Sequence, residues 1–255
     1  MTVDVHVNLS RWPFRRLRGD ATPELVDFLR ERGVTEAWAG SFDGLLHRDV
    51  AAVNARLADD CRRHGGGLLR PFGTVDPALP DWEEDLRRCH EEHRMPGIRL
   101  HPAWHGYVLD DPRFVQLLMR ATERRLIVQV ALRMEDERTR HPRLNVPEVD
   151  PGPLLDALRA VPRAKLVLLN AHRNVKPELV DRLAAAGVAG FDLAGLEGLG
   201  GVESFVKRVG VERVLFGSFF PLFTWESASL KLRESGLAPD VERAIRVDNA
   251  RRLTT

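Results

Sequence analysis

Short apolar runs of strand length alternate along the chain with longer stretches in which apolar residues recur about every 3.6 residues. Eight runs have strand length: 3–8, 36–41, 68–75, 97–101, 126–132, 165–170, 189–194 and 213–218. Helical periodicity follows them, as in residues 23–32 and 177–187. Eight such units in 255 residues predict one α/β domain, residues 1–255, folded as a single (β/α)₈ TIM barrel. A doubly wound open sheet would more often use about five or six strands.

Residues typical of helix ends support this pattern. Thr22 before Pro23 predicts an N-cap followed by proline at the first helical position. Gly33, Gly187 and Gly236 stand where a left-handed residue would end a helix.

The charge of the chain is balanced, with 38 Lys and Arg against 37 Asp and Glu, a formal net charge of +1. No overall field would therefore attract nucleic acid or an acidic membrane. No stretch approaches the roughly 18 unbroken apolar residues of a membrane span, and the N-terminus reads as a strand rather than a signal peptide. We expect a cytoplasmic protein without nucleic-acid or membrane partners.

The two cysteines, Cys61 and Cys89, lie in helical stretches. They have neither CxxC spacing nor neighbouring Cys/His clusters, so a disulfide framework or a structural zinc site is not expected. Both are interpreted as reduced thiols.

Polar residues gather at the predicted strand ends, where TIM-barrel enzymes carry their active sites. Four of the nine histidines fall there: His6, His101, His105 and His172. Alternation along a strand places further polar residues on shared faces: Asp4, His6 and Asn8; Arg99 and His101; Gln129 and Arg133. Since buried charge is costly unless it is paired or serves a ligand, this predicts a polar pocket at one rim. Asp4 could equally be a structural partner at the barrel floor, and His172 could cap the next helix.

Three motifs carry a resemblance to a known family. They are DVHVN at 4–8, GIRLHP at 97–102 and RVLFGSFFP at 213–221. The chain resembles the amidohydrolase superfamily nearly end to end, in particular its amidohydrolase-2-like TIM-barrel hydrolases and decarboxylases. That family has Asp-x-His-x-His, Gly-Ile/Val-Lys-Leu-His-Pro and Arg-Val-Leu-Phe-Gly-Ser/Thr-Asp-x-Pro at these places. The scaffold residues match, and most of the chemical ones differ.

The resemblance implies metal ligands at positions 6, 8, 131 and 219, and only His6 is retained. Asn8, Ala131 and Phe219 stand at the other three positions, and Ala and Phe have no donor atom. Phe219 also replaces the family's proton acceptor, and Asn170 stands at a family histidine. We therefore expect no tightly bound catalytic metal. The alternative is a weak divalent site, such as zinc, at His6.

Some superfamily members, such as lactonases acting on pyrone dicarboxylates, work without metal. Hydrolysis would then use other groups, and the catalytic candidates are His101, His6, His105 and Glu197. His101 is the main proton-handling candidate, because the charge of Arg99 on the same strand face should keep its imidazole neutral near pH 7. His105 is the second choice.

Arg99 and Arg133 are expected to face the space that a metal would occupy. Two guanidinium groups there predict a small anionic ligand, most simply a carboxylate. The alternative is internal neutralisation by Asp192, Glu135 or Asp136. Trp104 and Tyr107 are expected to form apolar pocket walls, with core packing as the alternative. The full set of expected substrate-binding residues is Asn8, Arg99, Trp104, Tyr107, Gln129, Arg133, Asn170 and Asp192.

Two long loops are expected at this rim. Residues 133–150 exceed the usual length of a βα connection and predict a lid, or a salt-bridge network among Glu135, Asp136, Glu137, Arg138 and Arg140. Residues 9–20 combine arginines with aromatics and are expected to close the pocket or to contact a second subunit in a homo-oligomer.

The sequence thus favours a divergent amidohydrolase-like hydrolase or carboxy-lyase acting on a small carboxylate-bearing molecule. A catalytically inactive pseudoenzyme or small-ligand binding protein on the same barrel is the alternative, and a structural role is a third.

Overall fold

The protein is a single (β/α)₈ barrel, as the alternation of runs predicts. The computed structural model describes residues 1–135, 140–141, 143–172 and 175–255. Eight parallel strands pair in chain order. They are β1 (Thr2–Leu9), β2 (Val34–Ser41), β3 (Leu69–Thr74), β4 (Gly97–Leu100), β5 (Ile127–Ala131), β6 (Lys165–Leu169), β7 (Gly190–Asp192) and β8 (Val214–Leu215). The backbone of β1 meets the segment after β8, where the Val5 amide donates to the Phe216 carbonyl at 2.9 Å.

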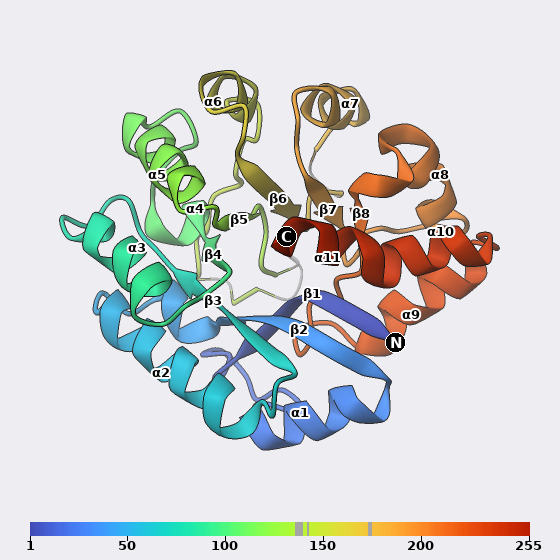
Figure 1. Ribbon diagram of the computed structural model, residues 1–255, viewed down its shortest axis with the longest axis horizontal. Helices are drawn as coiled ribbons and strands as arrows, with labels where there is room; N and C mark the ends of the chain where they lie inside the picture. Colours follow the sequence, from blue (N-terminus) through green and yellow to red (C-terminus); the bar gives the residue numbers. More distant parts are fainter. Residues whose placement is uncertain (136–139, 142, 173–174) are drawn as a thin grey trace.

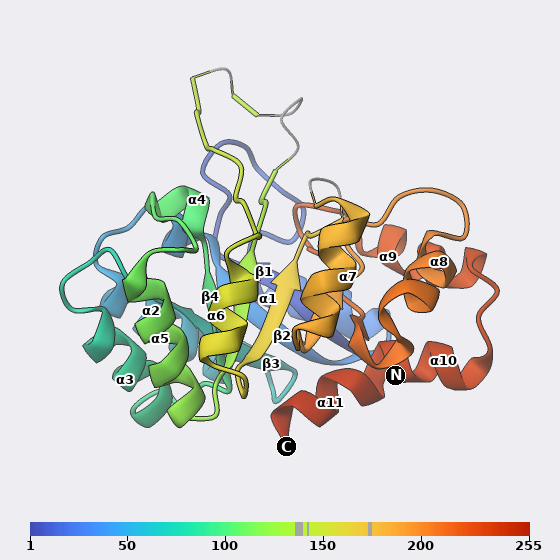
Figure 2. The same cartoon turned by 90° about the horizontal axis from the view of Figure 1, so that it is seen from above.

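Helices surround the strands as an outer ring (Figure 1). The ring consists of α1 (Thr22–Glu31), α2 (Val50–His64), α3 (Trp82–Glu91), α5 (Pro112–Glu123), α6 (Leu154–Ala160), α7 (Pro177–Ala185), α8 (Gly201–Val209) and α9 (Trp225–Glu234). The short α4 (Pro102–His105) follows β4, and α10 (Pro239–Arg243) and α11 (Asn249–Thr254) lie at the end where the strands begin (Figure 2). No helix in the described part of the chain is long and apolar enough to cross a membrane.

The helix-end signals are mostly correct. Gly33, Gly187 and Gly236 have positive φ angles of 70°, 106° and 57°, each one residue beyond the C-cap of α1, α7 or α9, which confirms them as left-handed helix stops. The N-cap prediction is one residue off. Ala21 has the extended backbone of the N-cap, and Thr22 is already helical, so its side chain caps nothing.

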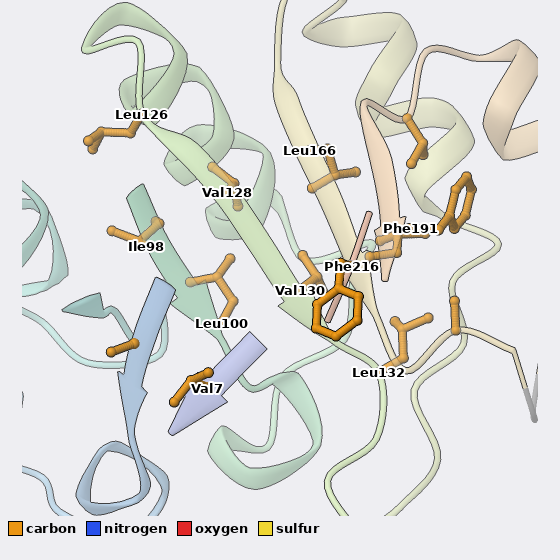
Figure 3. Packing of buried hydrophobic residues seen from close by; sticks show 14 of the residues in the cluster. Val7, Ile98, Leu100, Leu126, Val128, Val130, Leu132, Leu166, Phe191 and Phe216 are labelled. Carbon is orange, nitrogen blue, oxygen red and sulfur yellow. The ribbon is translucent and has the colours of Figure 1, made fainter. Parts of the chain in front are cut away.

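The core has two layers. Between strands and helices lies an outer cluster that includes Ile98, Leu100 and Phe191 (Figure 3). Inside the barrel lies an inner cluster that includes Trp38 and Phe72. Full burial of such an apolar side chain stabilises the fold by about 1.5–3 kcal/mol. The two clusters therefore hold the strands that carry the rim residues.

A bulge in β1 changes which side chains face inward. The pairing of β1 with β2 shifts register between Asp4 and Val7. Val5 packs in the inner cluster, whereas Val7 packs in the outer one. The expectation that Asp4, His6 and Asn8 share one face is therefore wrong, because strict alternation does not continue through a bulge.

Both cysteine thiols are free and buried. Burial raises the pKa of Cys61 to about 12 and raises that of Cys89 further. Since the thiolate is the reactive form, we expect neither thiol to react with Ellman's reagent within minutes in the folded protein. Two thiols per chain should react after unfolding in guanidinium. A rapid stoichiometric reaction of the native protein would contradict this burial.

Candidate active site

A cavity of about 680 Å³ opens at the carboxyl ends of β5 to β8. Its apolar walls include Met134, Leu196, Phe219, Phe223 and Leu230. Its charged wall residues are Arg133, Glu135, Glu197, Glu226, Lys231 and Glu234. Three of the residues expected from the sequence line it: Arg133, Asn170 and Glu197. The cavity occupies the rim at which TIM-barrel enzymes perform chemistry, so it is the candidate active site.

A buried histidine–carboxylate pair lies at the same end of the barrel. His6 Nδ1 is 2.7 Å from Asp192 Oδ2, and both side chains are 0% exposed. The other Asp192 oxygen accepts a hydrogen bond from the Asn170 amide at 2.8 Å. The bond from Asn170 holds the Asp192 carboxylate in place, and this carboxylate in turn fixes the orientation of the His6 imidazole.

This arrangement keeps His6 neutral. Burial lowers its pKa to about 4, outweighing the opposite effect of the Asp192 carboxylate. A neutral imidazole that donates from Nδ1 to Asp192 carries its lone pair on Nε2, and Nε2 has no hydrogen-bond partner among the described residues. A carboxylate-oriented imidazole of this kind can act as a general base.

Phe219 covers this imidazole. Its ring stacks on His6 with centroids 4.3 Å apart, and the same residue lines the cavity. Its φ angle of 59° is a left-handed conformation that is costly for a bulky residue. His6 therefore lies one aromatic ring away from the cavity.

Arg99 ties the strands together inside the barrel and does not face the cavity. All five of its N–H donors are taken by protein acceptors. They are Gln129 Oε1 at 2.8 Å, the Val7 carbonyl and Asn8 Oδ1 at 2.8 Å each, the Trp38 carbonyl at 3.0 Å and the Val5 carbonyl at 3.4 Å. The expectation that Arg99 faces a ligand is therefore wrong, because its guanidinium has no donor left. Gln129 is likewise engaged, since its amide also donates to the Val5 carbonyl at 2.8 Å.

Asp4 connects β1 to the segment after β8. One of its oxygens accepts hydrogen bonds from the amides of His6 at 3.1 Å and Ser218 at 3.0 Å. Burial raises the pKa of Asp4 to about 7 despite these bonds, which lower it. The fully enclosed carboxyl is thus placed for a structural role.

His101, His105 and Tyr107 form a separate group beyond β4, and none of them lines the cavity. The rings of His101 and His105 are 6.0 Å apart, and His105 Nε2 is 2.8 Å from the Gly44 carbonyl. The pKa of His101 is well below its ordinary value, chiefly because of burial, then because of His105 and Arg99. Arg99 therefore acts on His101 in the expected direction, but as a lesser cause.

Two rim loops meet above the barrel (Figure 2). Arg15, in the loop after β1, forms an ion pair with Glu135, in the loop after β5. Trp12 packs edge-on against Phe42 and Trp104, with ring centroids 5.1 and 5.8 Å apart. Of the expected salt-bridge network, Asp136, Glu137 and Arg138 lie outside the described residues. The lid role of residues 133–150 stays a prediction.

The residues at the family's metal positions do not fit a metal ion. Asn8 Oδ1 is taken by Arg99, His6 Nδ1 faces Asp192, and Ala131 and Phe219 offer no donor. Within the part of the chain that the structure describes, no three His, Cys, Asp or Glu side chains group so that they could hold a metal. A catalytic zinc would need about three such ligands.

The comparison with known families agrees with the fold and the strand motifs. A model of the amidohydrolase family matches residues 3–253. Because the match covers nearly the whole chain, the protein belongs to the amidohydrolase family. No curated protein sequence matches the chain.

Several solved structures share the fold at low sequence identity. The 5-carboxyvanillate decarboxylase of Sphingomonas paucimobilis is 13% identical with a TM-score of 0.78, covering 99% of this chain and 98% of that one. A dihydroxybenzoic acid decarboxylase of Polaromonas, with bound manganese, is 13% identical with a TM-score of 0.76, covering 99% and 96%. A probable 2-pyrone-4,6-dicarboxylic acid hydrolase of Acinetobacter baumannii, with citric acid bound, is 13% identical with a TM-score of 0.68, covering 99% and 98%.

Proposed function

We propose that the protein is an enzyme that acts on a small carboxylate-bearing molecule without using a metal ion. The observation that carries this proposal is a cavity lined by Phe219, whose ring stacks on the His6 of a buried His6–Asp192 pair. The family supports it, since the similar structures are named for dihydroxybenzoic acid, carboxyvanillate and pyrone dicarboxylic acid, all of which are carboxylic acids.

Hydrolysis is the reaction that the geometry favours over loss of CO₂. As the oxygen of a water bonds to the acyl carbon of the substrate, a neutral His6 can accept the proton through Nε2, while Asp192 holds the Nδ1–H and stabilises the imidazolium that forms. The imidazolium then returns the proton to the leaving alkoxide as the lactone C–O bond breaks. A carboxy-lyase would instead need a protonated imidazole to deliver a proton to carbon. In this proposal His6 takes the main proton role rather than His101, because Asp192 orients its imidazole and Phe219, which stacks on that ring, also lines the cavity.

The test is turnover of a panel of small lactones and aromatic carboxylates, followed by proton NMR. His6→Gln and Asp192→Asn are each expected to lower kcat about 100-fold or more, the usual contribution of a general base. His64→Gln, an exposed change on α2, is the matched control and should leave the rate unchanged. Addition of EDTA or Zn²⁺ should also have no effect. Full activity of folded His6→Gln, or activity that depends on added metal, would refute the proposal.

One observation favours a second candidate, a binding protein without turnover. His6 is fully buried with Phe219 stacked on its ring, so a ligand in the cavity touches no proton-transfer group of the pair in this conformation. Under this alternative, compounds of the same panel bind in the cavity and remain unchanged.

A further inference from the structure

Lys231 is a cavity residue that the sequence does not single out. It lies on α9, the helix after β8, and lines the cavity together with its helix neighbours Ser227, Leu230 and Glu234. These positions are three to four residues apart, so they form one face of the helix. The side chain of Lys231 is half-buried in that face.

The ammonium group of Lys231 is held by the end of β7. Nζ donates to the Ala194 carbonyl at 2.5 Å and lies 3.5 Å from the Leu193 carbonyl. An ammonium has three N–H donors, so one donor remains beyond these contacts. The two carbonyls fix the position of the charge without neutralising it.

No carboxylate among the described residues forms an ion pair with Lys231, although several line the same cavity. Glu135 is paired with Arg15, and Glu226 accepts a hydrogen bond from Arg32 Nε at 2.7 Å. Asp192 and Glu197 act on Lys231 only through longer-range attraction, while burial lowers its pKa. A half-buried charge without an ionic partner is partly desolvated, and such a group in a cavity wall is typical of a ligand site.

The rest of the wall is suited to a flat apolar body. Phe223, Leu196 and Leu230 line the cavity, and Phe223 packs edge-on against the fully buried Phe219 at 5.1 Å. A molecule with one acidic group and an aromatic ring would place the acid at Lys231 and the ring against these side chains.

We propose that Lys231 is the residue that binds the acidic group of the ligand. The sequence assigned this role to Arg99 and Arg133. The donors of Arg99 are all used inside the barrel, whereas Arg133 lines the cavity together with Lys231. The inference rests on the proposed function for its substrate class, but it concerns binding and does not require turnover.

Benzoate, with benzamide as its uncharged counterpart, is the probe for this role. We expect benzoate to bind the wild type more tightly than benzamide, as measured by ligand-observed NMR titration. Lys231→Gln removes the charge but keeps donors for the Ala194 and Leu193 carbonyls, and it should weaken benzoate binding about 10-fold or more. The affinity for benzamide should stay unchanged. Lys231→Arg should keep most of the preference for benzoate.

Lys207→Gln is the matched control, because Lys207 is an exposed lysine on α8 paired with Glu203. It should bind both probes as the wild type does. Unchanged benzoate binding by Lys231→Gln, equal affinity of the wild type for the two probes, or no binding of benzoate at all would each overturn the inference. If benzoate binding depends on Lys231 but the panel shows no turnover, the inference holds and the enzymatic proposal fails. If the enzyme is active and Lys231→Gln binds benzoate normally, only the inference fails.

Discussion

Replacing Arg99 with methionine is expected to lower the free energy of unfolding by about 3–5 kcal/mol, the usual cost of breaking a buried charge network. Methionine fills a similar volume but donates no hydrogen bond. It would leave five acceptors of β1, β2 and β5 without their partner. Burial lowers the pKa of Arg99 to about 9, and the carboxyls of Asp192 and Asp4 act against that shift. Both carboxyls would lose the nearby positive charge. Urea denaturation followed by circular dichroism measures the effect.

Two further variants make this test specific. Arg63→Met, an exposed change on α2, should alter the free energy of unfolding by less than about 0.5 kcal/mol. Arg99→Lys keeps the charge but has three donors instead of five, so its stability should lie between those of the wild type and Arg99→Met. An Arg99→Met protein within about 1 kcal/mol of the wild type would mean that the network around Arg99 contributes little.

Arg99 shows what the alternation of side chains along a strand can predict and what it cannot. Alternation along β4 correctly turns its side chain into the barrel, and the resemblance to the family places a lysine there. The pattern could not show where the donors go, because two acceptors are the carbonyls of Val5 and Val7. These carbonyls lie at the bulge in β1, which apolar alternation alone does not indicate. A charge that the sequence suggests for a ligand is therefore used to hold four strands.

The candidate site was only partly predictable for a similar reason. The rule that strand ends carry the chemistry selected His6, Asp192, Asn170 and Glu197, but it could not show that His6 and Asp192 are in contact across 186 positions. Lys231 was missed because a lysine in an amphipathic helix looks the same in sequence whether it faces water or a cavity.

The rule also could not show which half of the rim is open. On the side of β1 to β4, the space above the strands is filled by packed aromatic side chains, including Trp12, Phe42 and Trp104. The open cavity lies over β5 to β8 instead. His101 and His105, at the end of β4, are enclosed on that side, with His101 1% exposed and the His105 side chain 6% exposed, although positions at a strand end are those of catalytic residues.

Removing the Asp4 charge is expected to change how stability depends on pH. The folded state raises the pKa of Asp4 from 3.8 to about 7, so between about pH 4 and 7 it holds a proton that the unfolded chain has released. Stability from Asp4 therefore falls as pH rises through this range, by up to about 1.4 kcal/mol per unit. His6 has the opposite effect. Its pKa falls from 6.5 to about 4, so its contribution rises with pH between these values.

In the wild type, Asp4 lowers and His6 raises the free energy of unfolding as the pH increases, so the two effects oppose each other. In Asp4→Asn only the effect of His6 remains. Asparagine resembles the protonated carboxyl and retains the oxygen that accepts from His6 and Ser218. The free energy of unfolding of the variant, minus that of the wild type, should therefore increase from pH 4.5 to pH 7.5 by on the order of 3 kcal/mol. Other titrating groups are common to both proteins and cancel in this difference. Asp240→Asn, an exposed change on α10, should give a difference that is nearly flat with pH. A flat difference for Asp4→Asn as well would mean that Asp4 is ionised in the folded protein across the whole range, with its charge compensated by the amides and by Arg99.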